Sequence, residues 1–163
     1  MVIPVDIDVN QLHQLGKDFQ WVKPTSCPKC GGGLWWHGFV TAYLSCFAEA
    51  VFLRRIYCPY CFSSHRLRPK IFWSRFQSSF KTIENVISYR QKHGRWQPDL
   101  PRPRQRQWWH RMRKKVKVCL GMSFSGEPSE AFALFLEASS IPVSSVMQCG
   151  NSTFNQQPTE VYP

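Results

Sequence analysis

Two cysteine pairs are the residues of this sequence whose type and spacing point most directly to chemistry. Cys27 and Cys30 lie within CPKC, and Cys58 and Cys61 repeat the same spacing within CPYC. A two-residue spacing lets both sulfurs of a tight turn face one ion, and two such turns complete a tetrahedron. Because four thiolates leave no position for a catalytic water, the pattern predicts one structural Zn²⁺ ion.

Other interpretations of the cysteines fit the sequence less well. A redox pair of the thioredoxin type would occur once, beside a βαβ pattern, and cysteines that only fill a core would not repeat this spacing. An odd total of 7 cysteines argues against a disulfide framework. His65, which follows Cys61 closely, is an alternative to one thiolate ligand. The cysteines without a paired spacing are expected to be free thiols: Cys46, Cys119 and Cys149.

The residues between the cysteine pairs predict strands that position them. Segments 34–44 (LWWHGFVTAYL) and 50–57 (AVFLRRIY) are rich in aromatic and β-branched residues, and the second leads directly into CPYC. Paired cysteine turns carried on β-hairpins predict a zinc ribbon over residues 24–72. A segment of this size has little core of its own, so the metal is expected to contribute on the order of 10 kcal/mol to its folding.

The charge of the chain predicts an anionic partner. The net charge is +11, and the excess is concentrated between Arg54 and Lys117, where 18 Lys and Arg residues stand against only Glu84 and Asp99. Such a segregated excess favours binding to nucleic acid, and duplex DNA is the expected partner. The predicted contact residues are Arg54, Arg55, Arg66, Arg68, Arg102, Arg104, Arg106, Arg111, Arg113 and Lys114.

Helical spacing begins after the predicted ribbon. One apolar stripe contains Phe76, Phe80, Ile83 and Ile87, and a second contains Trp109, Met112, Val116 and Leu120. Prolines at 98, 101 and 103 separate the two. A helix, a proline-containing connection and a basic helix predict a helix-turn-helix-like unit over residues 73–120. The alternative for the basic stretch is an ordinary solvated helix face, or a helix that binds a membrane surface or a protein.

The two ends of the chain differ from its basic middle. Residues 1–23 are expected to form a strand and helix segment. Residues 121–163 contain no Lys or Arg and are expected to form a short helix at 129–138 followed by a flexible tail. This C-terminal segment is a candidate surface for a protein partner. The N-terminus lacks the pattern of a signal peptide, and no apolar run reaches membrane-spanning length. These features predict a soluble, cytoplasmic, nucleoid-associated α+β protein that does not bind membranes.

The order of these motifs resembles a known family. The successive segments CPKCGGGLWWHGFV, LRRIYCPYC, RPKIFWSRFQSSFKTIENVI and GRWQPDLPRPRQRQWWHRM resemble bacterial zinc-ribbon proteins with a following helix-turn-helix, related to the N-terminal DNA-binding region of insertion-sequence transposases. The resemblance implies zinc on the four cysteines and DNA contacts around Arg102 to Arg113. The proline-rich span departs from the standard geometry of that unit.

Together these features predict a non-enzymatic function. Transposases of the resembling type depend on three metal-binding carboxylates, and this chain has 10 acidic residues without a convincing array. We therefore expect an accessory factor or regulator of a mobile element that binds DNA. The alternative is a zinc ribbon that binds RNA or a protein complex and uses the basic helix for docking. The tryptophans would suit base stacking in that case.

Overall fold

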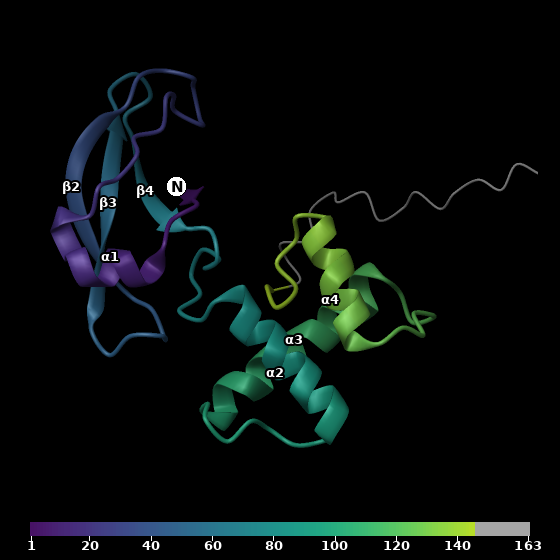
Figure 1. The fold of residues 1–163 in the computed structure, drawn as a ribbon. Coiled ribbons are helices and arrows are strands. Elements are labelled where there is room, and N and C mark those ends of the chain that lie inside the picture. The colour runs from purple at the N-terminus through teal and green to yellow at the C-terminus, as the bar shows by residue number, and fades with distance from the viewer. Residues whose placement is uncertain (146–163) are drawn as a thin grey trace, which may run out of the picture. The chain divides into compact units, whose positions relative to one another are not determined.

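The structure, a computed structural model, describes residues 1–145 and divides into two compact units. The first unit, Met1–Phe80, contains a four-stranded sheet, and the second, which starts at Lys81, is helical (Figure 1). The predicted α+β class is thereby confirmed. The predicted flexible tail falls largely on residues 146–163, which lie outside the described residues.

The sheet has the strand order β1-β4-β3-β2. β2 (Trp35–Tyr43) pairs antiparallel with β3 (Ala50–Cys58), and β3 pairs antiparallel with β4 (Ser63–Pro69). β1 (Val2–Val5) pairs parallel with β4. The segment 1–23, which we predicted apart from the ribbon, thus contributes a strand to the same sheet.

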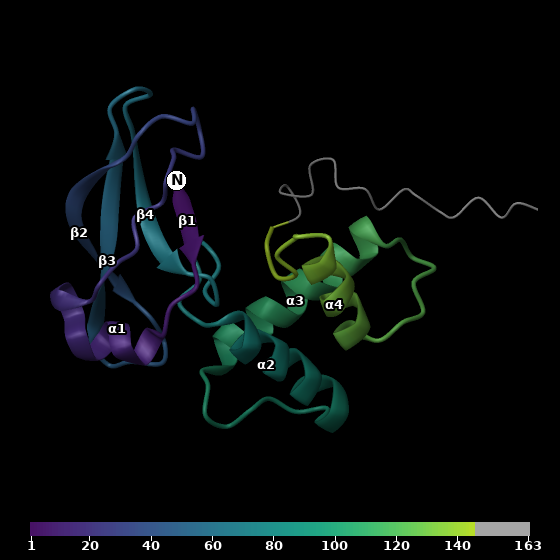
Figure 2. The ribbon, with the colours of Figure 1, turned by 45° about the horizontal axis from the view of Figure 1, so that its top comes forward.

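The sheet unit has two clusters of buried side chains, one near each end of β3. The short helix α1 (Val9–Leu15) starts at Asp8, whose carboxylate accepts a 2.8 Å hydrogen bond from the Asn10 amide, and α1 packs against β3 (Figure 2). The cluster beside α1 contains Val9, Leu12, Phe19, Leu44, Val51, Leu53 and Phe72. The other cluster contains Cys27, Leu34, Ile56, Cys58 and Leu67, so two of the predicted metal ligands belong to a core.

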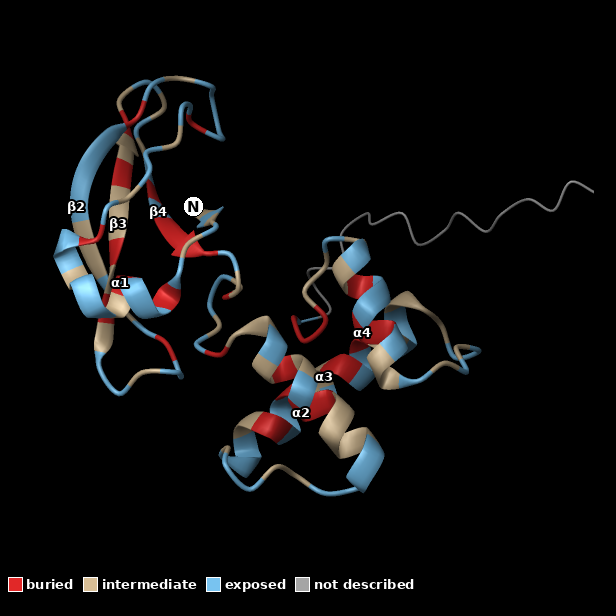
Figure 3. Ribbon diagram, viewed as in Figure 1, coloured by how far each residue is buried: buried red, intermediate tan, exposed pale blue. Residues whose placement is uncertain are grey.

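Within the described residues, the helical part of the structure contains three longer helices. These are α2 (Phe80–His93), α3 (Arg102–Cys119) and α4 (Pro128–Glu137), and their buried residues face one another (Figure 3). Pro103 is tolerated in the first turn of α3 because that position has no intrahelical partner for an amide. A capping box formed by Glu127 and Glu130 starts α4, one residue before the predicted 129–138.

The structure corrects two details of the predicted helices. Phe76, which the prediction included in the apolar stripe, lies before α2: residues 73–76 form a turn, and the Phe76 carbonyl accepts a hydrogen bond from the Arg68 guanidinium. The buried face of α3 is also rotated relative to the predicted stripe. It holds Gln105, Trp108, Met112 and Lys115, two of them polar, in place of Trp109, Met112, Val116 and Leu120.

Candidate metal centre and basic helix

The first cysteine turn is closed by backbone hydrogen bonds. The Gly31 amide donates to the Cys27 carbonyl and the Cys27 amide donates to the Gly32 carbonyl, both at 2.8 Å. Gly31 has a φ of 75°, a left-handed conformation that glycine adopts without strain. The Lys29 amide points at the Cys27 sulfur, 3.4 Å away. The turn therefore presents a backbone donor to one sulfur.

The second turn repeats this geometry between two strands. β3 ends at Cys58 and β4 begins at Ser63, so the pair Cys58 and Cys61 lies in the β3–β4 connection. Phe62 follows Cys61 as Gly31 follows Cys30, and it also has a left-handed φ, of 55°. A left-handed conformation costs a non-glycine residue about 1–2 kcal/mol. The strained backbone at Phe62 places the second pair in the same turn as the first.

The two turns bring all four sulfurs together. The Sγ atoms of Cys27, Cys30, Cys58 and Cys61 lie within 4.8 Å of one another, and all four cysteines are free thiols. The Cys27–Cys61 and Cys30–Cys58 sulfurs are 3.7 and 3.5 Å apart. A tetrahedral ion with metal–sulfur bonds of about 2.3 Å requires sulfurs about 3.8 Å apart. The cluster can thus hold one metal ion without large movement of its ligands.

Two thiols of the cluster have pKa values that are shifted in opposite directions. Hydrogen bonding to Ser63 lowers the pKa of Cys61 to about 6, against the effect of burial and with help from Cys30. At Cys30 the Gly32 amide favours the thiolate, but the neighbouring sulfur of Cys58, partial burial and the other two cysteines raise the pKa to about 12. A cation that binds here must displace the Cys30 proton, because a metal ligand is a thiolate.

His65 lies beside the cluster without belonging to it. The ring is buried, and its Nε2 is 3.3 Å from the Cys27 sulfur, while Nδ1 has no hydrogen-bond partner among residues 1–145. Burial, together with the positive charges of the N-terminus and Lys29, lowers the pKa of His65, so the ring is held neutral. A neutral ring with the proton on Nε2 donates to the Cys27 thiolate and stabilises it. His65 would therefore support a cysteine ligand from outside the cluster, whereas the sequence offered it as an alternative ligand.

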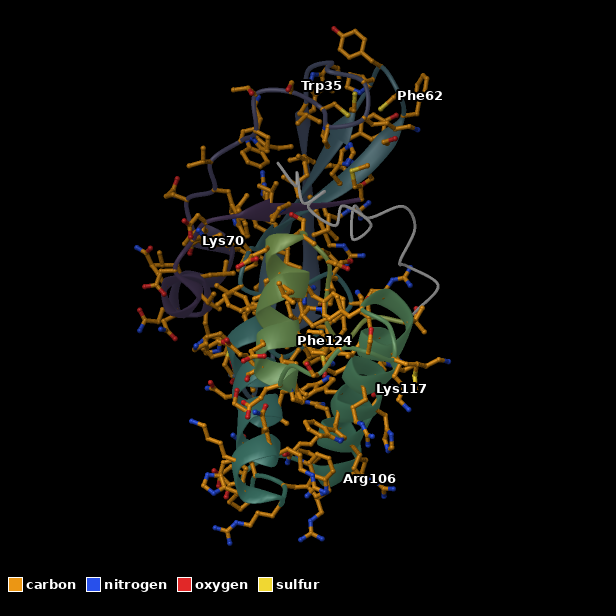
Figure 4. All side chains as sticks on the ribbon, turned by 90° about the vertical axis from the view of Figure 1, so that its right-hand side faces the viewer. Trp35, Phe62, Lys70, Arg106, Lys117 and Phe124 are labelled. Atoms are coloured by element: carbon orange, nitrogen blue, oxygen red, sulfur yellow. The ribbon has the colours of Figure 1, made fainter. Side chains whose placement is uncertain are left out.

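The basic helix α3 separates its polar and buried faces. Gln105, Trp108, Met112 and Lys115 face the unit interior. On the opposite side, residues at steps of four, four, three and four share one stripe that is exposed along its whole length. The stripe residues are Arg102, Arg106, His110, Arg113 and Lys117, and Figure 4 shows Arg106 and Lys117 projecting outward.

Of the predicted contact residues on α3, Arg102, Arg106 and Arg113 lie on this stripe, Lys114 lies beside it, and two others are half-buried. Arg113 and Lys114 are exposed, whereas Arg104 and Arg111 are intermediate in exposure. Lys115, next to them, is completely buried. Its ammonium donates to the Ser140 hydroxyl, the Ile141 carbonyl and the Ser144 hydroxyl at 2.6–3.0 Å and lies 5.1 Å from the Phe135 ring centroid.

The predicted contact residues on the sheet have different neighbours from those on α3. Arg54 lies over the rings of Trp36 and Phe39, 4.8 and 4.4 Å from their centroids. Arg55 donates to the Ser64 hydroxyl and stands opposite the exposed Arg66 in the β3–β4 register. Like charges directly opposite each other on a sheet repel, so an anion bound between these two guanidinium groups would reduce the repulsion.

Arg68 is the exception among the predicted contacts. It is only 7% exposed, it donates to the Phe76 carbonyl, and burial together with Arg66 lowers its pKa. Its guanidinium holds the turn that precedes α2. We therefore leave Arg68 out of the proposed contact surface.

Gln105 and Lys115 are the site residues that sequence reasoning missed. A periodicity argument assigns polar residues to the solvent side, and nothing in the sequence near Gln105 marks its partners. A signal was nevertheless present: Gln105 and Lys115 continue the helical spacing of Trp108 and Met112, because the four residues follow one another at steps of three, four and three.

Comparison of the chain with protein-family models, with curated proteins and with solved structures finds no match. The resemblance to transposase-related proteins therefore stays a prediction that rests on the quoted motifs. Within residues 1–145, no helix is both long enough and apolar enough to cross a membrane.

Proposed function

We propose that this chain is a non-enzymatic zinc-ribbon protein that binds duplex DNA, as an accessory factor or regulator of a mobile element. The observation that carries the proposal is the exposed cationic stripe of α3, which faces away from the buried side of the same helix. α3 contains no acidic residue. A helix with its own buried anchor and a largely basic outer face suits a groove lined with phosphates.

The dimensions of α3 agree with this use. It has 18 residues, which corresponds to a length of about 27 Å at 1.5 Å per residue. The DNA major groove is about 12 Å wide and admits one helix. Arg102, Arg106, Arg113 and Lys117 would contact phosphates on such a path, and His110 and Gln107 lie on the exposed side where they would reach base edges.

The relation to a helix-turn-helix is part of the proposal. α2 and α3 are joined by residues 94–101, which is longer than the usual turn of about 3–4 residues. The connection is nevertheless anchored, because the Gln105 side chain bonds to backbone groups of Gln97 and Leu100. We infer that α3 serves as the recognition helix of a variant unit with a long, fixed turn.

Zinc is the metal that best suits the cysteine cluster. Four thiolates in a small tetrahedral arrangement select zinc among common cellular ions, and a closed set of four leaves no site for substrate. Two of the ligands, Cys27 and Cys58, also belong to the core beside Leu34, Ile56 and Leu67. The ion would therefore stabilise the cysteine end of the sheet and take no part in catalysis.

Exposed aromatic side chains near the cysteines favour a second candidate function. Trp35 is 65% exposed and Phe62 is 79% exposed, and both project from the cysteine end of the sheet (Figure 4). Exposed apolar rings of this size are typical of interaction surfaces. They would suit a zinc ribbon that binds RNA or a protein complex, with α3 as a docking helix.

Salt-titrated binding to a DNA duplex tests the main proposal. Each neutralised phosphate contributes about 0.9 to the slope of log affinity against log salt. The double variant Arg106→Glu, Arg113→Glu should flatten that slope by about two units. The matched control Lys23→Glu, Lys92→Glu changes the net charge equally at exposed positions outside α3 and should affect the slope much less.

Two results would count against the proposal. Equal losses in the α3 variant and the control would mean that only the total charge matters. Tighter binding to single-stranded RNA than to duplex DNA, lost in Trp35→Ala, would support the second candidate.

The zinc assignment has its own test. Elemental analysis should find one zinc per chain in the wild type and in Cys46→Ser, whose exposed thiol lies outside the cluster. The double variant Cys27→Ser, Cys58→Ser should lose the metal. Zinc retained by that variant would refute the four-cysteine site.

A further inference from the structure

A hollow beside the start of α3 has the chemistry of a nucleobase site. It is lined by Trp96, Arg102, Pro103, Arg106 and Gln107, and its volume is about 480 Å³. Small-molecule sites usually measure roughly 300–1,000 Å³. The lining combines one large aromatic ring, two guanidinium groups and one amide, and it includes no acidic side chain.

The indole of Trp96 is held in place from within the helical unit. The Arg90 guanidinium lies over the ring, 4.4 Å from its centroid, and also donates to the Gly94 carbonyl. The backbone of the neighbouring residue, Gln97, makes two hydrogen bonds with the buried Gln105 side chain: its amide donates at 3.0 Å and its carbonyl accepts at 2.8 Å. The ring is therefore positioned before any ligand binds, which lowers the entropic cost of stacking on it.

The other groups around the hollow match the parts of a nucleotide. A base stacks well on an indole, since every base has a π face. Arg102 and Arg106 are one helical turn apart and both are exposed, so they can hold the phosphates on either side of that base. The Gln107 amide offers a donor and an acceptor to a base edge.

These contacts select against other ligands. A cationic group would be repelled by Arg90, Arg102 and Arg106, and a purely apolar one would leave guanidinium groups unpaired. A base that is paired in the interior of a duplex has both faces covered by its neighbours, so it cannot stack on Trp96.

We propose that this hollow binds one unpaired nucleobase of a DNA strand, stacked on Trp96, while the α3 stripe holds the adjoining duplex. The inference rests on the proposed DNA-binding function and narrows its substrate. The preferred DNA is then a duplex with a bulged base, a flipped base or a short single-stranded end, rather than a continuous helix.

Binding of the full-length, zinc-loaded chain to two DNA molecules tests this inference. One is a blunt duplex and the other is the same duplex with a single-stranded overhang of a few nucleotides. Stacking of one base should make the overhang duplex bind about 5- to 150-fold more tightly to the wild type. Trp96→Leu should remove that preference and change blunt-duplex affinity less than about twofold, while Trp96→Phe should keep part of the preference.

A control and a second measurement make the outcomes distinct. Trp36→Leu alters an exposed tryptophan of the sheet unit and should keep the full preference. In the unaltered wild type, an overhang that carries 5-iodouracil should crosslink under ultraviolet light to Trp96. Equal affinity of the wild type for both duplexes, or crosslinks only elsewhere, would overturn the Trp96 site but leave duplex binding by α3 intact. Absence of binding to either DNA would overturn both proposals.

Discussion

The side chain of Gln105 fixes the connection before α3, and its replacement by leucine should loosen that connection. The side chain is completely buried. It accepts a hydrogen bond from the Gln97 amide at 3.0 Å and donates to the carbonyls of Gln97 and Leu100 at 2.8 and 2.7 Å. Leucine has a similar size, so Gln105→Leu removes these hydrogen bonds with little change in volume.

The expected cost follows from these contacts. Three hydrogen bonds at about 1 kcal/mol each give a loss of about 3 kcal/mol. The leucine side chain recovers about 1 kcal/mol through burial of additional apolar surface. The free energy of unfolding of the helical unit should therefore fall by about 2 kcal/mol. The opening that exposes the Gln97 amide becomes easier by a similar amount, equivalent to roughly 30-fold faster exchange.

Hydrogen exchange at the Gln97 amide and urea unfolding followed by far-ultraviolet circular dichroism measure the two effects. Gln107→Leu is the matched control, because Gln107 is exposed on the same helix, and it should change stability by less than about 0.5 kcal/mol. A Gln105→Leu protein with wild-type stability and an equally protected Gln97 amide would refute the reasoning.

Three further predictions concern other parts of the chain. Phe62→Gly should raise the melting temperature of the metal-loaded sheet unit. The relief of about 1–2 kcal/mol of left-handed strain exceeds the roughly 0.5–1 kcal/mol entropic cost of glycine. A lower melting temperature would show that the exposed ring packs in solution. Glu127→Ala should destabilise α4 by about 1 kcal/mol in thermal unfolding, since it removes one half of the capping box. Zinc affinity, measured against a chelator of known affinity, should fall at least about tenfold per pH unit between pH 8 and 7, because zinc displaces the proton of Cys30, whose pKa is raised to about 12. A pH-independent affinity in that range would contradict proton displacement.

The sequence predicted the parts of the sheet unit that depend on local pattern. β2 and β3 lie where β-branched and aromatic residues accumulate, and the repeated cysteine spacing predicted which four sulfurs cluster. The parallel pairing of β1 with β4 joins residues more than sixty positions apart, and no local pattern indicates such a partner. The contact of His65 with the Cys27 sulfur depends on the same long-range arrangement.

The face of α3 shows why polar residues limit predictions from periodicity. The apolar stripe through Trp109 and Val116 lies within one helical step of the buried side, yet the structure buries Gln105 and Lys115 instead. Both are satisfied by groups of neighbouring segments, the connection before α3 and residues 140–144 after α4. Hydropathy alone cannot reveal such partners, because burial of these side chains is favourable only after the partners are in place.

The difference in exposure between the adjacent residues Lys114 and Lys115 makes unfolding of the helical unit measurable by chemical modification. Lys114 is exposed, while the neighbouring ammonium is enclosed by the Phe135 ring and three oxygen atoms. A small amount of an amine-acylating reagent would modify Lys114 in the native protein, but Lys115 only in molecules whose helical unit has opened. A protease that cleaves only at acidic residues leaves both lysines on one peptide. Mass spectrometry could then use the ratio of the two modifications as a measure of opening, with the exposed lysine as internal standard, even in a crude cell extract.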